Sequence, residues 1–191
     1  MVFIGDICDF HSINFHDHNP ALPSPSEEIK IDKEKIKEWY SVFPNALICR
    51  GNHDNLPVRK GMSHGLPSEM IREVDVIMQF PKQWIYRYDF IIDKVRYFHG
   101  TGYSGKYAHI KAIHDNRMSV VMGHLHSVAG VEFSATKKDI CFGMSVGCGI
   151  NIKSPAFGYG EDYVRKPILG CGVVSYTDRG INAQFVPMEL T

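Results

Sequence analysis

Four short apolar runs in this chain end in the same way, in a glycine next to a side chain that can bind a metal ion. The four junctions are Gly5-Asp6, Gly51-Asn52-His53, His99-Gly100 and Gly123-His124-Leu125-His126. Short apolar runs bounded by turn-forming residues are typical of buried strands. Sites in α/β sheets form beyond the carboxyl ends of strands, so side chains far apart in the sequence can converge there. The pattern therefore favours an α/β fold with a polar centre at its strand ends.

The first of these junctions belongs to a predicted β-α-β unit. Val2-Phe3-Ile4 and Ala46 to Cys49 are the two apolar runs. Between them, Ser24 is placed to cap a helix, with Pro25 at its first position and Glu27 completing a capping box. Strands joined through a helix pair in parallel, so we expect these two strands to be parallel neighbours.

The rest of the chain predicts two more helices and a β-rich second half. One helix is expected to open at Pro67-Ser68-Glu69 and run toward Met78, and another to span Tyr107 to His114. Strands are expected at Trp84–Tyr88, Phe90–Ile92, Val95–Phe98, Ser119–Met122, Val128–Phe133, Ile140–Val146, Ile168–Tyr176 and Ile181–Val186. Residues 150–167 form a long Gly/Pro/aromatic loop, and loops of that length are often functional.

Composition sets limits on the class of protein. A chain of 191 residues suits one domain over 1–191. Its formal net charge of zero gives no bulk electrostatic argument for binding nucleic acid or a membrane. No apolar run approaches the ~20 residues that span a bilayer, and no secretory leader is evident. The five cysteines form no C-x-x-C pair, which favours reduced thiols and a cytoplasmic protein.

Besides His53, the junctions offer a carboxylate, an amide oxygen and three imidazoles, but no thiolate. This donor set suits Mn, Fe, Zn or Ni and argues against a structural Cys-rich zinc site. A lone Gly-Asp after a strand is usually a turn, and a lone Asn-His-Asp is often a solvated loop. The ordered occurrence of all four junctions favours a site over those simpler explanations.

The same residues resemble a known family. "GDICD" (5–9), "GNHD" (51–54), "HG" (99–100) and "GHLH" (123–126) occur in the order found in the calcineurin-like metallophosphoesterases. The stretch "GDICDFHSINFHDHNP" and, more weakly, "GCGINIKSPAFGY" resemble a subgroup from bacteriophages and prophages. The resemblance implies a sandwich of two mixed β-sheets flanked by helices, in a bacterial or phage-infected cell. It also implies metal-dependent hydrolysis of phosphate esters, a phosphodiester or a phosphomonoester.

The resemblance also implies a role for each motif residue. It assigns metal binding to Asp6, Asn52, His99, His124 and His126, with Asp6 bridging two ions. His126 would serve the first ion, and the others would complete the second site. His53 would lie near the scissile phosphate and assist a metal-activated hydroxide, while Asp54 would orient His53. Asp9 would not bind an ion itself but would support the residues around the ions. Two such cations can clamp the phosphoryl oxygens of an in-line displacement.

One part of the family pattern is missing. The family begins with a strand ending in Asp-x-His, whose side chains bind the first ion, but here Gly-Asp already stands at position 5. Asp9-Phe10-His11 is an Asp-x-His, yet Asp9 already matches the second aspartate of "GDICD". Either the domain is truncated at its N-terminus, or it binds a single ion, or another segment substitutes for the missing motif. From this chain we expect one tightly held ion and low activity. We also expect an exposed sheet edge beside Val2-Phe3-Ile4, through which copies of the chain can associate.

Other residues beside the motifs are candidates for contacting substrate. These candidates are His11, Arg50, Tyr103 and Lys106, and the last three are equally explained as ordinary half-exposed side chains. Histidines outside the motifs are expected at the surface or in loops; they are His16, His18, His64, His109 and His114. The substrate is a phosphorylated compound, which in a phage setting favours nucleic acid or nucleotides. The alternative function is a catalytically impaired scaffold of the same fold that binds a partner.

Overall fold

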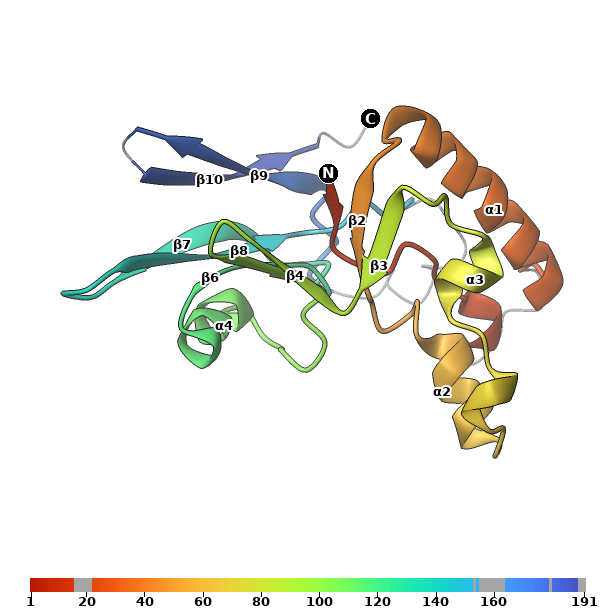
Figure 1. The fold of residues 1–191 in the computed structure, drawn as a ribbon. Coiled ribbons are helices and arrows are strands. Elements are labelled where there is room, and N and C mark those ends of the chain that lie inside the picture. Colours follow the sequence, from red (N-terminus) through yellow and green to blue (C-terminus); the bar gives the residue numbers. More distant parts are fainter. Residues whose placement is uncertain (16–21, 153, 155–163, 179, 189–191) are drawn as a thin grey trace. The chain divides into compact units, whose positions relative to one another are not determined.

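The computed structural model describes residues 1–15, 22–152, 154, 164–178 and 180–188. Within it the chain forms two compact units, Met1–Tyr88 and Asp89–Thr191. Each unit is an α/β or β-rich body with its own sheet, as Figure 1 shows. The expected α/β class is thus confirmed, while the prediction of a single domain over 1–191 stays a prediction. His16, His18 and most of the predicted 150–167 loop lie outside the described residues.

The first unit is built on a parallel sheet of three strands. These strands are β1 (Val2–Phe3), β2 (Ala46–Cys49) and β3 (Trp84–Arg87), in the order β1-β2-β3. Val2 pairs with Leu47, and Ala46 pairs with Trp84, both in parallel register. The predicted parallel neighbours are confirmed. In the described chain β1 lies at an edge of this sheet, and self-association through that edge stays a prediction.

Helices of the first unit connect its strands. They are η1 (His11–Ile13), α1 (Pro25–Val42), α2 (Leu56–Ser63), η2 (Ser68–Met70) and α3 (Val74–Met78). The predicted capping box is present at the start of α1, where the Ser24 backbone N–H donates to Glu27 at 2.9 Å. The helix expected from Pro67 to Met78 is wrong in extent, because it is divided into η2 and α3.

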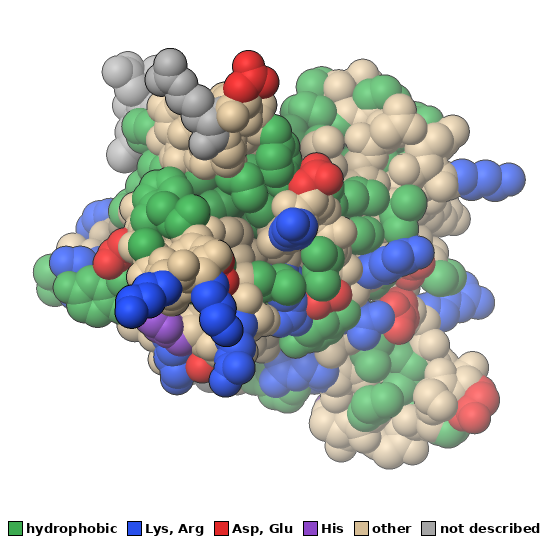
Figure 2. All heavy atoms as spheres, turned by 60° about the vertical axis from the view of Figure 1, so that its left-hand side comes forward, with side chains coloured by type: hydrophobic (Ala, Val, Ile, Leu, Met, Phe, Trp, Pro, Cys, Tyr) green, Lys and Arg blue, Asp and Glu red, His purple; other side chains and the backbone are tan. Residues whose placement is uncertain are grey.

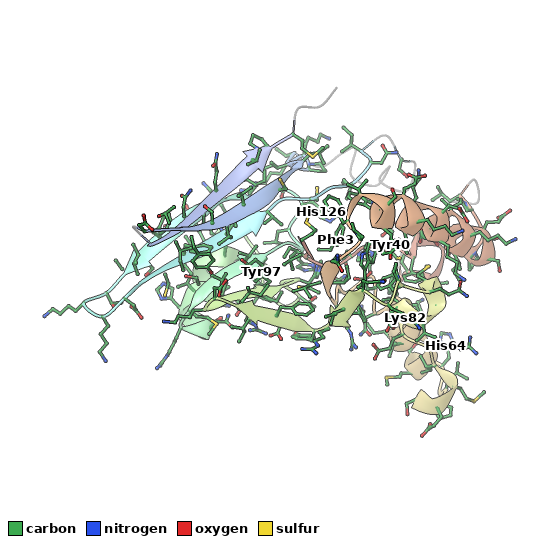
Figure 3. All side chains as sticks on the ribbon, turned by 45° about the horizontal axis from the view of Figure 1, so that its top comes forward. Phe3, Tyr40, His64, Lys82, Tyr97 and His126 are labelled. Atoms are coloured by element: carbon green, nitrogen blue, oxygen red, sulfur yellow. The ribbon has the colours of Figure 1, made fainter. Side chains whose placement is uncertain are left out.

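An aromatic cluster fills the core of this unit between the sheet and α1. Phe3 on β1 and Tyr40 on α1, both labelled in Figure 3, pack against Trp84 with ring centroids 5.5 and 6.2 Å apart. The Trp84 indole N–H donates to the Phe43 carbonyl at 2.8 Å, so its one polar group is satisfied. Ile48 on β2 is fully buried in the same core. Burial of these apolar side chains holds α1 against the sheet.

The second unit is built on a mixed sheet in the order β4-β5-β6-β8-β7. Its strands are β4 (Asp89–Ile92), β5 (Val95–Phe98), β6 (Ser119–Met122), β7 (Ala129–Ala135) and β8 (Ile140–Val146). The central pairs β5–β6 and β6–β8 are parallel, and the outer pairs β4–β5 and β7–β8 are antiparallel. Only this sheet is mixed among the described strands, whereas the sandwich expected from the sequence has two mixed sheets.

A helix and a hairpin complete the second unit. Helix α4 (Ala108–Asn116) packs on β6 and β8, with Ala112 and Ile113 buried against Val120. The antiparallel hairpin β9 (Gly170–Thr177) and β10 (Gly180–Pro187) contacts β7 and β8, and it lies on the other face of the sheet in Figure 1. The carboxyl ends of the parallel strands β5 and β6 therefore remain side by side at one end of this unit.

The surface and the helices fit the composition. On the face drawn in Figure 2, acidic and basic side chains are interspersed with hydrophobic ones, as a net charge of zero would suggest. Among the described residues, none of the helices combines the length and the apolarity needed to cross a bilayer.

Candidate functional site

The first unit gathers its motif residues in two adjacent loops, one after β1 and one after β2. Because β1 and β2 are parallel neighbours, their carboxyl ends lie side by side. The Asp6 carboxylate accepts a hydrogen bond from the backbone N–H of His53 at 2.8 Å. Asn52, between Gly51 and His53, is partly buried in the same loop. The structure thus brings together Asp6, Asn52 and His53, as the sequence predicts.

Asp6 occupies an unusual backbone conformation. Its φ is +53°, in the left-handed region that few residues other than glycine adopt. Gly51 lies directly against it: a Cβ on Gly51 would overlap the Asp6 Oδ1 and backbone nitrogen, and would lie 2.7 Å from Cγ. The glycine of "GNHD" is therefore required for the close approach of the two loops. Strain of this kind persists where the surroundings hold it, often at functional sites.

Asp54 fastens the two loops together. Its carboxylate is 1% exposed and accepts hydrogen bonds from the backbone N–H groups of Asp6, Cys8 and Gly51, at 2.8, 3.1 and 2.9 Å. Charge-assisted bonds to three donors in a buried setting are strong. Asp54 thus fixes the loop backbone, a role that the sequence did not suggest, since the resemblance gave it the orientation of His53.

The carboxylate found beside His53 is instead that of Asp9. The His53 Nδ1 lies 2.8 Å from Asp9 Oδ1 and 2.9 Å from the Asp9 carbonyl oxygen. Both neighbours of Nδ1 are acceptors, so Nδ1 carries a proton and Nε2 is the nitrogen left for exchange with a substrate. The expectation that Asp54 orients this ring is corrected accordingly. Asp9, expected to support the residues around the ions, is the residue that does so.

Charge around His53 favours its protonated form. Burial lowers the pKa of His53, but the Asp9 hydrogen bond and the Asp6 charge outweigh it and raise this pKa to about 9. An opposite charge at hydrogen-bonding distance favours the charged form in this way. His53 in the metal-free protein is therefore an imidazolium at neutral pH, the form required of a general acid.

Two candidate substrate residues of this unit have other contacts. The Arg50 guanidinium donates to Glu73 at 2.6 Å and lies over the Tyr86 ring at 5.5 Å. Its charge is thus paired within the fold. His11 has its Nδ1 4.0 Å from Asp9 Oδ2, and its Nε2 is buried without a hydrogen-bond partner among the described residues. His11 thus lies beside the Asp9 carboxylate that contacts His53.

The second unit gathers imidazoles in the loops after β5 and β6. These strands are also parallel neighbours, and the backbone N–H of Gly123 donates to the His99 carbonyl at 3.0 Å. The His99 Nε2 lies 3.1 Å from the His124 Nδ1, and His99 is only 4% exposed. His124 has a φ of +67°, a conformation that is uncommon for residues other than glycine. The sequence prediction that His99 and His124 meet is confirmed within this unit.

The spacing of these two nitrogens suits a metal ion. Two nitrogens bound to one ion at about 2.0–2.1 Å lie roughly 3.0–3.4 Å apart when they occupy adjacent coordination positions. His126, labelled in Figure 3, follows two residues after His124, and its carbonyl accepts from the Ile168 N–H at 2.8 Å. The loop that bears both histidines is thus anchored to the segment before β9.

Tyr103 and Lys106, the other candidate substrate residues, lie in the loop between β5 and α4. The Tyr103 ring packs edge-on against Phe98 at 5.8 Å, and its hydroxyl accepts from Asn116 at 3.3 Å. Burial raises the pKa of Tyr103. The Lys106 ammonium lies over the Tyr107 ring at 5.4 Å. These contacts are internal to the second unit and fit half-exposed side chains that pack on their own loop.

No protein-family model matches the chain, and no curated protein matches it. The candidate site is therefore interpreted from its own residues, their distances and their charges.

Proposed function

We propose that the chain is a metal-dependent phosphoesterase built as a metallophosphoesterase sandwich. The observation that carries the proposal is the His53–Asp9 pair, an imidazole held at 2.8 Å by a carboxylate beside the Asp6 loop. Two acceptors on one ring nitrogen hold the imidazole in one orientation, which an ordinary solvated histidine does not require. The order of the four motifs along the chain gives independent support.

The donors of each unit suit divalent transition ions. We propose that Asp6 and Asn52 provide oxygen ligands in the first unit, and that His99, His124 and His126 provide nitrogen ligands in the second. Carboxylate, amide and imidazole donors without thiolate favour Mn, Fe, Zn or Ni. The 3.1 Å approach of the His99 and His124 nitrogens fits two ligands of one ion. When bound, such ions lower the pKa of water toward neutrality and offset the charge of a phosphoryl group.

The chain's own residues supply the proton chemistry. In its protonated form, His53 would donate a proton from Nε2 to the leaving oxygen as the ester bond breaks. Asp9 accepts from Nδ1, which keeps the ring in one orientation and stabilises its positive charge. The backbone N–H of His53 also donates to the Asp6 carboxylate, so the acid and the proposed ligand are held at a fixed separation. Positioning of this kind accounts for much of the rate gain in phosphoryl transfer.

Hydrolysis of a small aryl phosphodiester and an aryl phosphomonoester, each with added Mn²⁺, tests the proposal. His53→Gln should lower kcat by about 10²-fold or more while the metal content by elemental analysis stays unchanged, as for loss of a general acid. The matched control is His64→Gln, because His64 is an exposed histidine at the end of α2. Equal loss of metal and activity would make His53 a ligand. Full activity in the variant would contradict the proposal.

A further inference from the structure

An aromatic ring and two cations form a second feature of the first unit, on the segments that follow Asp9 and Asp54 along the chain. Phe15 is 56% exposed, with the Lys60 ammonium 3.9 Å and the Arg59 guanidinium carbon 5.2 Å from its ring centre. We call these three residues the Phe15 cluster. Among the described residues, neither cation forms an ion pair with a carboxylate.

The cluster stands on a fixed support. The Glu28 carboxylate of α1 accepts from the backbone N–H groups of His11 and Ser12, at 2.7 and 3.0 Å, which anchors η1. Asn14, just before Phe15, is 6% exposed. On the other side, Leu56 is buried at the start of α2, and α2 contacts η1. The segment that carries the ring is therefore anchored to α1 and packed against α2.

The two segments that form the cluster leave directly from the candidate site. Helix α2 begins at Leu56, two residues after Asp54, and Arg59 is bonded through its backbone N–H to Asn55. The η1 segment begins at His11, two residues after Asp9. Figure 3 labels His64, which marks the end of α2 away from this junction. A ligand bound at the cluster would thus extend from the neighbourhood of the His53–Asp9 pair.

The chemistry of the cluster fits one class of ligand. An exposed aromatic ring can stack on any nucleobase, so this contact does not depend on the nucleotide sequence. Neighbouring cations attract the flanking phosphates. A double helix keeps its bases stacked on each other, so only an unpaired base can use the ring. We propose that the Phe15 cluster binds an unpaired base and its flanking phosphate in a single-stranded nucleic acid. This inference rests on the proposed phosphoesterase function and names its substrate class.

Binding of a fluorescently labelled ten-nucleotide oligo(dT) in EDTA tests the inference without hydrolysis. Phe15→Ala should weaken binding by about tenfold, whereas Phe15→Trp should retain it. The matched control is Tyr88→Ala, which removes an aromatic ring that is 60% exposed and should bind like the parent. A Phe15→Ala protein that binds as tightly as the parent would overturn the inference. The inference would also be overturned if Phe15→Ala weakened binding equally to an oligonucleotide that lacks bases, because no base can stack there.

Charge and strandedness provide a second test that does not depend on the Phe15 variant folding. The double variant Arg59→Gln/Lys60→Gln should lower the slope of log K against log salt by about one. Its control, Lys137→Gln/Lys138→Gln, removes two exposed charges at the turn between β7 and β8. The unlabelled single strand should compete better than a duplex or inorganic polyphosphate. Equal competition by all three would overturn the inference.

The two proposals fail in different ways. If oligonucleotide binding depends on Phe15 but the protein hydrolyses no phosphoester with any added metal, the proposed enzyme function is wrong and the proposed role of the Phe15 cluster stands. If the protein hydrolyses the small aryl esters but Phe15→Ala leaves oligonucleotide binding unchanged, the enzyme function stands and the role of the cluster is wrong.

Discussion

The two units of this chain place their polar motif residues in similar positions but use different side chains. In each, two neighbouring parallel strands end in loops that carry the polar motif residues, β1 and β2 in the first unit and β5 and β6 in the second. In each, one motif residue other than glycine has a positive φ, Asp6 in the first and His124 in the second. The first unit presents oxygen donors and the His53–Asp9 pair, whereas the second presents imidazoles.

The loops also differ in what holds them. In the first unit a buried side chain, Asp54, accepts three backbone N–H groups from both loops. In the second unit the strand ends are joined by a backbone bond, from the Gly123 N–H to the His99 carbonyl. A site held by one carboxylate can be undone by one substitution, while a site held by backbone bonds cannot. The comparison therefore predicts unequal sensitivity of the two units to mutation.

The largest expected effect is that of Asp54→Ala. Three buried N–H groups would lose their acceptor, and each unsatisfied buried donor costs about 1–3 kcal/mol. We expect the free energy of unfolding of the first unit to fall by at least about 3 kcal/mol, measured by urea denaturation. Hydrogen exchange should accelerate at the amides of Asp6, Cys8 and Gly51, and the amide of Gly123 should keep its protection.

The control for this variant is Glu69→Ala, which removes an exposed carboxylate of η2. It should change stability by less than about 0.5 kcal/mol. A small effect of Asp54→Ala, or an equal acceleration of exchange in both units, would contradict the proposed contrast. In that contrast the first unit's loops depend on the Asp54 side chain, and the second unit's loops depend on a backbone hydrogen bond.

The strand ends could be predicted from the sequence because their signal is local. An apolar run that stops at a glycine is visible in a few residues, and the capping box of α1 needs only Ser24 and Glu27. Parallel pairing then follows from the length of the connection between strands. For this reason the amino-acid sequence alone could predict, within each unit, that Asp6 meets His53 and that His99 meets His124.

Other features carry no local signal. The donors to Asp54 at Asp6 and Cys8 are backbone groups 48 and 46 residues away, so the sequence could not distinguish its role from that of Asp9. Helix α2 was not predicted, because it is short and contains Gly61, a poor helix former. Burial of Leu56, a tertiary contact, stabilises its start. The Phe15 cluster likewise depends on two segments that meet only in the folded unit.

The second effect concerns Gly51 and sharpens the comparison at the closest approach of the two loops. Gly51→Ala places a methyl group on the Asp6 carboxylate and backbone, which cannot give way as a flexible side chain can. We expect a loss of about 1–3 kcal/mol in unfolding free energy, the usual cost of overpacking. The control is Gly149→Ala, where an added Cβ meets nothing within 4 Å. A neutral Gly51→Ala would show that the loops are not in tight contact.

The smallest effect, and the one that only the first unit should show, is a pH dependence from the His53–Asp9 pair. The pKa of His53 is about 9 in the folded protein, above its ordinary value of 6.5. The folded state therefore binds the proton more tightly than the unfolded state. Stability from this proton is fully present below about pH 6.5 and is lost as the pH rises through about 9.

His53 is partly exposed, so solvent screening reduces this contribution to about 1 kcal/mol. Asp9→Asn removes the charge that sustains the pair, and we expect it to lower the His53 pKa and to flatten the pH dependence. Proton NMR titration of the ring in EDTA, together with urea unfolding at pH 6, 7.5 and 9.5, measures both. Asp115→Asn, an exposed aspartate of α4, controls for the general loss of one charge. If His53 of the parent protein titrates near pH 6.5, and Asp9→Asn does not change this pKa, the two residues do not interact as proposed. The first unit would then lose its acid and differ from the second only in its donor atoms.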